Sequence, residues 1–174
     1  LMTEKESSII NSAISLFAQE GYDGTSTLSI AKKAGVSEGL IFKHFKNKRG
    51  LLEKLIMMGE NQIQMMIKPI ESLTHPKVIL KHILTIPLNI GVNEKKLFTL
   101  IFSMRWKIDD NRMDLSNVFK PMILNSFKAL NYDDPISETR SFLMVLDGAM
   151  LYTLQKDSKY DSLILNNLLN KFDL

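Results

Sequence analysis

Apolar residues recur along this chain at intervals of three and four positions, the spacing that places side chains on one face of an α-helix. The first such run occupies residues 3–20, and Gly21 is expected to end that helix. Two short helical patterns follow, and a long one begins at Lys48. Pro69 lies in its last turns, where the missing N–H and the ring are expected to bend the helix or end it early.

The rest of the chain continues this periodicity. The dipeptide His75-Pro76 ends the long helix region, because the residue before a proline disfavours helical geometry. Five further helices are predicted, at residues 77–89, 94–108, 115–130, 137–155 and 160–172. The pattern therefore predicts an all-α protein of about nine helices, with a three-helix module at residues 1–47 and a larger helical body at residues 48–174.

The two short helical patterns meet across a tight turn. Gly35 stands where the first helix should end in a left-handed conformation. Val36 follows as the apolar residue of the turn, and Ser37 offers a hydroxyl that can cap the second helix. The apolar residues on both sides are expected to share a core: Leu28, Ile30, Ala31, Ala34, Leu40, Ile41 and Phe45. This is the layout of a DNA-binding helix-turn-helix, whose second helix enters the major groove.

Positive charge is concentrated around this turn. Residues 31–54 contain only two carboxylates, Glu38 and Glu53, but seven cations: Lys32, Lys33, Lys43, Lys46, Lys48, Arg49 and Lys54. The whole chain carries a net charge of +3, so the excess is local to this stretch. A solvated helix face would also explain exposed lysines. A local excess of cations is, however, what binding to phosphate requires.

The run from Ala13 to Leu52 resembles the N-terminal domain of the TetR family of bacterial transcriptional regulators. The matching residues are Leu16-Phe17-Ala18, Gly21-Tyr22, Thr25, Ile30-Ala31, Ala34-Gly35-Val36-Ser37, Gly39, His44-Phe45, Lys48 and Leu51-Leu52. One position departs from the family pattern, since members usually carry a tyrosine where this chain has Phe42. A phenol there would be expected to hydrogen-bond a phosphate, so Phe42 keeps the packing role and loses that bond.

The resemblance implies a DNA-contacting surface on the second short helix and its flanks. The expected residues are Thr27, Ser37, Glu38, Gly39, Leu40, Phe42, Lys43, His44, Lys46 and Lys48. Gly39 is expected to permit close approach to the groove, Thr27 to cap its helix while touching phosphate, and Lys48 to bind the phosphate backbone without reading bases. Because one short helix contacts few bases, a two-fold dimer is expected to read both halves of a palindromic operator.

The resemblance also implies that the body binds a small effector and that this binding weakens DNA affinity, as in a repressor. The expected lining consists of large side chains that would equally suit a packed core. It comprises Met66, Phe98, Phe102, Trp106, Phe119, Met122 and Tyr152, with Arg105 and Tyr152 as polar contacts. Such a lining favours a mostly apolar or amphipathic molecule.

The last two helical patterns are expected to form the dimer interface. Gly148 and Ala149 would let another helix come close, and the final helix carries apolar residues on more faces than one monomer core can take. The expected interface residues are Gly148, Ala149, Leu165, Leu168 and Phe172.

Composition bears on whether the chain has disulfides, membrane spans, metal sites or cofactors. The 174 residues are 45% apolar and include no cysteine, which excludes disulfides and thiolate chemistry. No apolar run approaches the roughly 20 residues of a membrane span, and the first residues lack the layout of a signal peptide, so a soluble cytoplasmic protein without a membrane partner is expected. The histidines, His44, His75 and His82, have no metal-ligand spacing, and no cofactor motif occurs.

Two other classes of protein stay open. A helical interaction protein with weakened DNA binding would explain Phe42 and the anionic Glu38 beside the groove. Glu38 also suits the positive end of a helix dipole, and it can accept from a cytosine amine. An all-α enzyme would need a nucleophile with its base, a metal motif or a phosphate loop, and the sequence has none of these. An enzyme is therefore the least favoured class.

Overall fold

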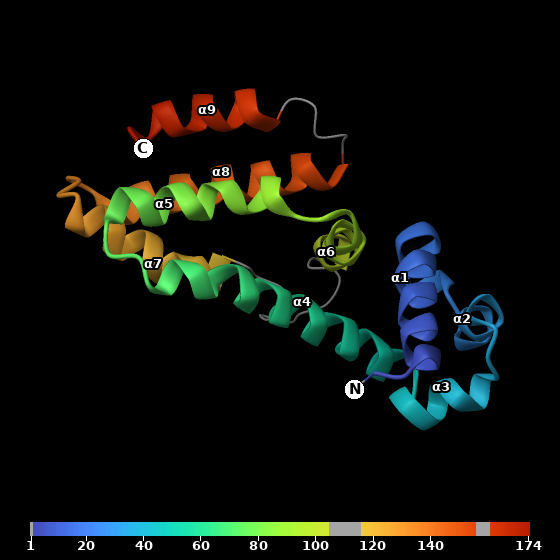
Figure 1. Cartoon of the computed structure of the whole chain (residues 1–174). Coiled ribbons are helices and arrows are strands. Elements are labelled where there is room, and N and C mark those ends of the chain that lie inside the picture. The colour runs from blue at the N-terminus through green and yellow to red at the C-terminus, as the bar shows by residue number, and fades with distance from the viewer. Residues whose placement is uncertain (1, 105–115, 156–160) are drawn as a thin grey trace. The chain divides into compact units, whose positions relative to one another are not determined.

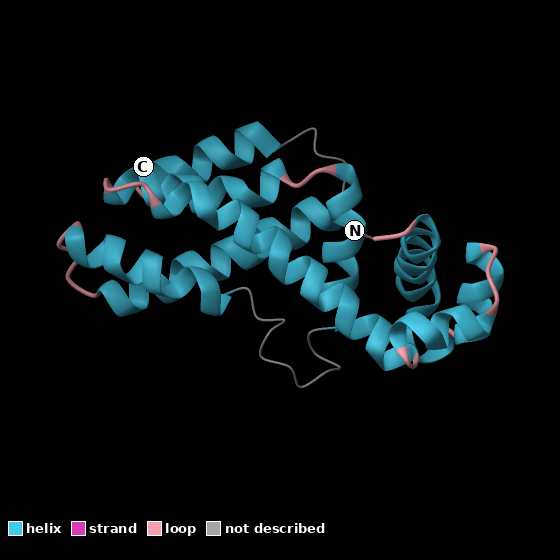
Figure 2. Ribbon diagram, turned by 60° about the horizontal axis from the view of Figure 1, so that its bottom comes forward, coloured by secondary structure: helices cyan, strands magenta, loops and turns pink. Residues whose placement is uncertain are grey.

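The computed structural model describes residues 2–104, 116–155 and 161–174. Within these ranges the chain folds into nine α-helices and one short 3-10 helix, without a strand (Figures 1 and 2). The predicted all-α fold class is confirmed. No helix in the described ranges is both long enough and apolar enough to cross a membrane.

The helix bounds follow the predicted pattern closely. In chain order the elements are α1 (Glu4–Gly24), α2 (Thr27–Ala34), α3 (Glu38–Phe45), α4 (Lys48–Glu71), α5 (Pro76–Thr85), the 3-10 helix η1 (Ile86–Asn89), α6 (Val92–Met104), α7 (Ser116–Ala129), α8 (Pro135–Gln155) and α9 (Asp161–Lys171). The long helix α4 includes Pro69 and ends at Glu71, and the bend expected near Pro69 stays a prediction. The helix predicted at residues 77–89 is divided into α5 and η1, and the predicted extension of α6 to residue 108 lies outside the described residues.

Local sequence signals explain how α1 begins and where it is interrupted. At its start, Thr3 and Glu6 form a capping box, in which the Thr3 N–H donates to Glu6 Oε2 (2.8 Å) and the Glu6 N–H donates to Thr3 Oγ1 (3.2 Å). Near its end, Gly21 adopts φ 77° and ψ 162°, a region that is essentially restricted to glycine. The regular helix is therefore broken at the residue that the sequence marked.

The helices group into two compact units. The first combines α1, α2, α3 and α4 up to Gln62 with α6, and the second combines the rest of α4 with α5, η1, α7, α8 and α9. In the first unit, α1 packs on α2 and α6, and α2 packs on α3. A side chain at Gly59 of α4 would collide with Ile101 of α6, so glycine permits this helix contact. The predicted domain boundary after residue 47 stays a prediction.

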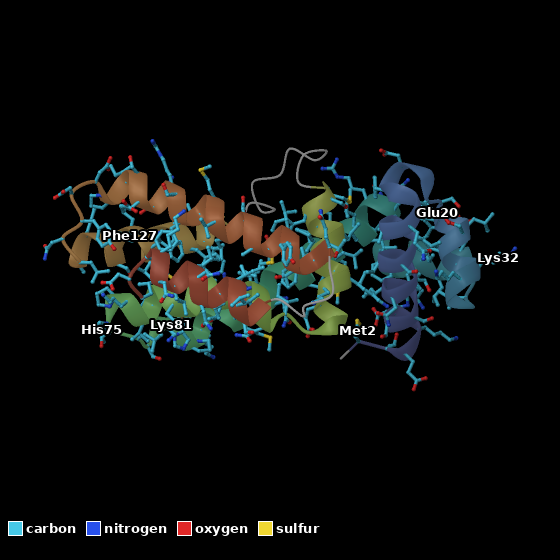
Figure 3. The ribbon with its side chains drawn as sticks, turned by 90° about the horizontal axis from the view of Figure 1, so that it is seen from above. Met2, Glu20, Lys32, His75, Lys81 and Phe127 are labelled. Atoms are coloured by element: carbon cyan, nitrogen blue, oxygen red, sulfur yellow. The ribbon has the colours of Figure 1, made fainter. Side chains whose placement is uncertain are left out.

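The second unit has an aromatic cluster, which we define as Phe127, Phe142 and Phe172. These residues come from α7, from α8 and from the turn that follows α9, and the Phe142 ring lies 5.8 Å from Phe127 and 4.9 Å from Phe172 (Phe127 is labelled in Figure 3). All three side chains are buried. Because buried aromatic side chains contribute large apolar areas, this cluster fastens α7, α8 and the C-terminal end of the chain together.

Candidate functional site

The turn between α2 and α3 has the geometry predicted from Gly35. This residue adopts φ 68° and ψ 33°, and its N–H donates to the Lys32 carbonyl at 3.3 Å. The Val36 N–H donates to the Ala31 carbonyl at 3.1 Å, which completes a Schellman motif at the end of α2. Ser37 stands at the N-cap of α3, but its hydroxyl makes no capping hydrogen bond. The motif is a tightly closed helix-turn-helix with an exposed serine at its second helix.

The start of α2 differs from the prediction. Ser26, and not Thr27, caps the helix, since its hydroxyl accepts from the Ser29 N–H at 3.0 Å. Thr27 is the first helical residue, and its hydroxyl donates to Glu38 Oε1 at 2.6 Å. Because Glu38 opens α3, this bond joins the starts of the two helices. Sequence reasoning misplaced the cap because Thr25, Ser26 and Thr27 offer three adjacent hydroxyls.

Helix α3 has a buried face and an exposed face. Ile41 and Phe45 are buried, and Leu40 is half-buried. The other predicted contact residues of α3 and its C-terminal flank are exposed: Gly39, Phe42, Lys43, His44 and Lys46. A side chain added at Gly39 would meet no atom within 4 Å. The N-terminal end of α3 is therefore open on its outer side.

Leu28 of α2 was expected in the core and is 62% exposed instead. The buried residues of this helix are Ile30 and Ala31. At 100° per residue, Leu28 is rotated by roughly 110° from the middle of the face that those two residues define. The error came from assigning every apolar residue of a short helix to one face.

His44 connects α3 to α1. Its Nδ1 lies 3.1 Å from Oε1 of Glu6, the residue that also closes the capping box with Thr3. Hydrogen bonds from the Thr3 backbone and hydroxyl, followed by the nearby His44, lower the pKa of the Glu6 carboxyl. The His44 ring, which is predicted to contact DNA, therefore already has a partner inside the module, Glu6.

Lys48, predicted to bind phosphate, has partners within the module. Its ammonium donates to the carbonyl oxygens of Tyr22 (2.8 Å) and Thr25 (2.9 Å), and it lies 4.4 Å from the centre of the Tyr22 ring. A cation is favourable beside the free carbonyls at the C-terminal end of a helix. Lys48 thus fastens the start of α4 to the turn between α1 and α2, a role that sequence reasoning missed. These contacts do not test the phosphate contact that the resemblance implies for Lys48.

The connection between α3 and α4 is only two residues long. Lys46 adopts a left-handed φ of 66°, and the Asn47 side chain accepts from the Gly50 N–H at 2.8 Å. A side chain at Gly50 would collide with the carbonyl oxygen of Phe45, so this position requires glycine. The end of α3 and the first turn of α4 therefore lie against each other without room for a side chain.

Most cations of residues 31–54 remain at the surface. Lys33 donates to the Ser15 hydroxyl at 2.7 Å, and Arg49 lies 3.7 Å from Glu53. Lys32 points away from α2 (Figure 3). The exposed cations are Lys32, Lys33, Lys43, Lys46, Arg49 and Lys54. They can bind phosphate without first leaving a buried position.

The side chains predicted to line an effector cavity are distributed over both units. Phe98 and Phe102 belong to α6 of the first unit and are buried. Phe119 of α7 is buried in the second unit, where Met66 of α4 and Met122 of α7 are half-buried. Two further residues predicted to line the cavity, Arg105 and Trp106, lie outside the described residues.

A pocket of about 250 Å³ lies within the second unit, between α5 with η1, α8 and α9. Its lining residues are Leu84, Leu88, Val145, Gly148, Ala149, Tyr152, Thr153, Ile164, Leu165 and Leu168. Of the predicted ligand residues that the structure describes, Tyr152 alone belongs to this lining.

The residues predicted to form the dimer interface lie at the pocket and in the aromatic cluster, and their role in a dimer stays a prediction. Gly148, Ala149, Leu165 and Leu168 line the pocket, and Phe172 is buried in the aromatic cluster. The most exposed apolar side chains of α8 and α9 beyond residue 140 are instead Met144 (75%), Leu151 (41%) and Leu163 (64%). Met144, Gly148 and Leu151 follow the spacing of one helix stripe, which we name the outer stripe of α8.

The N-terminal module matches a known family. Residues 9–55 match the family model described as bacterial regulatory proteins, tetR family. The uncharacterized HTH-type transcriptional regulator YvkB of Bacillus subtilis (strain 168) is 50% identical over 48 residues, which are 28% of this chain and 25% of that protein. The chain therefore spans only about a quarter of the length of this relative.

Other similarities extend over nearly the whole chain. The fatty acid metabolism regulator protein of Bacillus subtilis (strain 168) is 26% identical over 171 residues, 91% of this chain and 88% of that protein. A transcriptional regulator of the TerR/AcrR family from Aquifex aeolicus VF5 has a TM-score of 0.75 at 20% identity, covering 98% of this chain and 99% of that one. AibR, solved in complex with isovaleryl coenzyme A and operator DNA, has a TM-score of 0.74 at 18% identity, covering 97% of each chain. The N-terminal module therefore matches the tetR family of bacterial regulatory proteins over residues 9–55, and the chain as a whole shares the fold of these regulators.

Proposed function

We propose that this chain is a ligand-responsive transcriptional repressor that binds a palindromic operator as a homodimer in the cytoplasm. The observation that carries the proposal is the exposed face of α3, which is held by a closed turn and surrounded by exposed cations. A short helix with an open N-terminal end suits insertion into a major groove. The cations suit the phosphates on either side of that groove. No catalytic role is proposed.

The residues of the motif divide into contacting and positioning roles. Gly39 permits close approach to base edges, and Lys43 and Lys46 bind phosphate. The exposed hydroxyl of Ser37 is a further phosphate donor. Thr27 and Glu38 hold each other at 2.6 Å, so they act first by fixing α3 against α2.

Selection from random duplexes tests the DNA-binding proposal. Duplexes retained by the purified chain should share a palindrome, and Gly39→Leu should weaken binding to it by about 100-fold, because the added side chain blocks the groove and each lost base contact costs about 1–3 kcal/mol. The fold should stay intact, since no atom lies within 4 Å of the added Cβ. Gly24→Leu, at a glycine that is also free of neighbours within 4 Å but lies in α1, is the matched control.

Two outcomes would count against this proposal. Recovery of no common sequence would favour the helical interaction protein over the regulator. Full operator affinity in Gly39→Leu, with an unchanged circular dichroism spectrum, would show that α3 does not dock in the groove.

The dimer is proposed to form through the outer stripe of α8 together with Leu163 of α9. Contiguous exposed apolar residues favour association with a partner surface. A chain with both Met144→Glu and Leu151→Glu should sediment as a monomer and lose operator affinity, although neither position lies in the module. Met65→Glu, at a 68% exposed methionine of α4, is the control that should stay dimeric. An unchanged dimer in the double variant would place the interface elsewhere.

The effector is proposed to be a small apolar or amphipathic molecule that lowers DNA affinity by favouring one arrangement of the dimer. A relative over most of the chain is named for fatty acid metabolism, and AibR was solved with an acyl thioester of coenzyme A. Acyl thioesters are therefore the first class to test, by thermal shift and by release of the selected operator. An effector that stabilises the protein without releasing operator would remove the regulatory part of the proposal.

A further inference from the structure

The starting observation is a buried hydroxyl without a partner. Thr153 of α8 is 2% exposed, and its Oγ1 accepts or donates no hydrogen bond in the part of the chain that the structure describes. Other helical hydroxyls return a bond to the preceding turn: Thr99 to Lys95 (2.7 Å), Ser126 to Met122 (2.9 Å) and Thr139 to Pro135 (2.7 Å). A buried polar atom left without a partner lowers stability, so the unpaired Thr153 requires an explanation.

Thr153 also lines the pocket between α5 with η1, α8 and α9. The neighbours that share this lining are aliphatic residues from each element, among them Leu84, Val145 and Leu168, together with the Tyr152 ring. We propose that this pocket binds an uncharged aliphatic molecule, or the uncharged aliphatic part of a larger one, whose single hydrogen-bonding group is received by Thr153. The proposal rests on the proposed function, because it assigns the effector a location and a chemistry.

Size and charge narrow the class of ligand. The pocket volume is about 250 Å³. At about 30 Å³ for each water-sized group, it accommodates roughly eight such groups. Among the described residues, no lining side chain carries a charge, and a buried ionised group without a partner is strongly unfavourable. A threonine hydroxyl donates to a carbonyl and accepts from a hydroxyl, so the ligand end is a neutral ketone, ester, thioester or alcohol.

The geometry of α8 places the large side chains of the pocket and those of the proposed dimer surface on different faces. The large side chains of the outer stripe are Met144 and Leu151, whereas the pocket face contains Val145, Ala149 and Tyr152; Gly148, which has no side chain, lies at the border of the two faces. At 100° per residue, the centres of these two faces are roughly 100° apart around the helix axis. The strongly exposed side chains are on the outer stripe, so a second copy has an apolar surface of its own. The pocket is left to a small molecule.

Binding of 2-octanone to the full chain tests the proposal, with octanoate as the charged analogue of similar length. Calorimetry and thermal shift should detect 2-octanone more readily than octanoate. Thr153→Val should weaken 2-octanone binding by about 3- to 10-fold, the loss expected from one hydrogen bond. Ala149→Phe, which fills the pocket, should abolish it. Thr139→Val is the matched control, because Thr139 lies in the same helix with the same 2% exposure and should leave binding unchanged.

The two threonine variants should also differ without any ligand. Thr153→Val removes an unpaired hydroxyl and should raise the thermal midpoint, whereas Thr139→Val removes a formed hydrogen bond and should lower it or leave it unchanged. If Thr153→Val lowers the midpoint as Thr139→Val does, the Thr153 hydroxyl has a partner and the proposal fails. It also fails if octanoate binds more tightly, or if neither Thr153→Val nor Ala149→Phe alters 2-octanone binding.

One further result would assign the pocket to a second copy of the chain. If no probe binds and Ala149→Phe converts a dimer into monomers, the ligand proposal is overturned. These measurements use no DNA, so their failure leaves the operator selection as an independent test. Failure of the operator selection with Thr153-dependent binding of 2-octanone would instead overturn the regulator and leave the binding site standing.

Discussion

The three-helix module differs from the layer formed by α5, α8 and α9 in two respects. The polar side chains of the module that cap or join its helices are hydrogen-bonded, whereas the described part of the layer contains an unpaired hydroxyl and a pocket. In the module, the side chains of Thr3, Ser26 and Asn47 accept from backbone N–H groups, and Lys48 donates to backbone carbonyls. In the layer, the buried hydroxyl of Thr153 has no partner in the described residues and lies beside a pocket. A site that docks on a rigid partner benefits from fixed geometry, whereas a site that responds to a ligand needs unoccupied space.

The largest predicted effect is a loss of stability in the layer. It tests whether the empty space in the layer is confined to the pocket. Phe142→Ala in the aromatic cluster should lower the free energy of unfolding by about 3–5 kcal/mol, because it leaves a cavity among buried rings. Leu168→Ala, at the half-buried pocket lining, should cost less than about 2 kcal/mol, because space is already present there. Urea titrations of both variants measure the difference. Equal losses would mean that the packing is uniform along the layer.

The next effect separates structural from DNA-contacting lysines. Lys48→Met should lower the stability of the chain by about 1–2 kcal/mol, because the carbonyls of Tyr22 and Thr25 lose a charged donor. Operator binding by Lys48→Met should have the same salt dependence as that of the unaltered chain. Lys43→Met is the matched variant: an exposed lysine on α3 whose loss should leave the thermal midpoint unchanged and reduce the salt slope by about 1 unit. If Lys48→Met instead reduced the salt slope without lowering the stability, Lys48 would contact phosphate, as the family resemblance implies.

The smallest effect is a pH dependence of the module. The pKa of Glu6 is lower in the folded chain than its ordinary value of 4.5, chiefly because of its hydrogen bonds with Thr3. The carboxylate therefore contributes stability that is fully present above pH 4.5 and is lost as the pH falls through the lowered pKa. Glu6→Gln should flatten the thermal midpoint against pH in that acidic range, and Glu4→Gln, in the same helix turn, is the control. Identical profiles for the two variants would remove Glu6 from the acid response.

The features that could be predicted from the sequence are those with local causes. Gly35 ends α2 in a left-handed conformation, and the His75-Pro76 dipeptide precedes α5, because these residues act within one turn of the chain. The contacts of Lys48 could not be predicted, since its partners lie 23 to 26 residues away. The pocket joins residues from Leu84 to Leu168, so no local pattern distinguishes its lining from a packed core or a dimer surface.

The short connection between α3 and α4 has a mechanical consequence for the proposed docking of α3 on DNA. Only Lys46 and Asn47 connect the two helices, and Gly50 lies against the Phe45 carbonyl. The connection therefore leaves little room for α3 to move relative to α4. A small rotation of the first turn of α4 must therefore turn α3 by a similar angle, because no flexible length exists to absorb it. If α3 enters the major groove as proposed, the first turn of α4 sets its direction, so a small shift of that long helix changes how α3 meets the DNA.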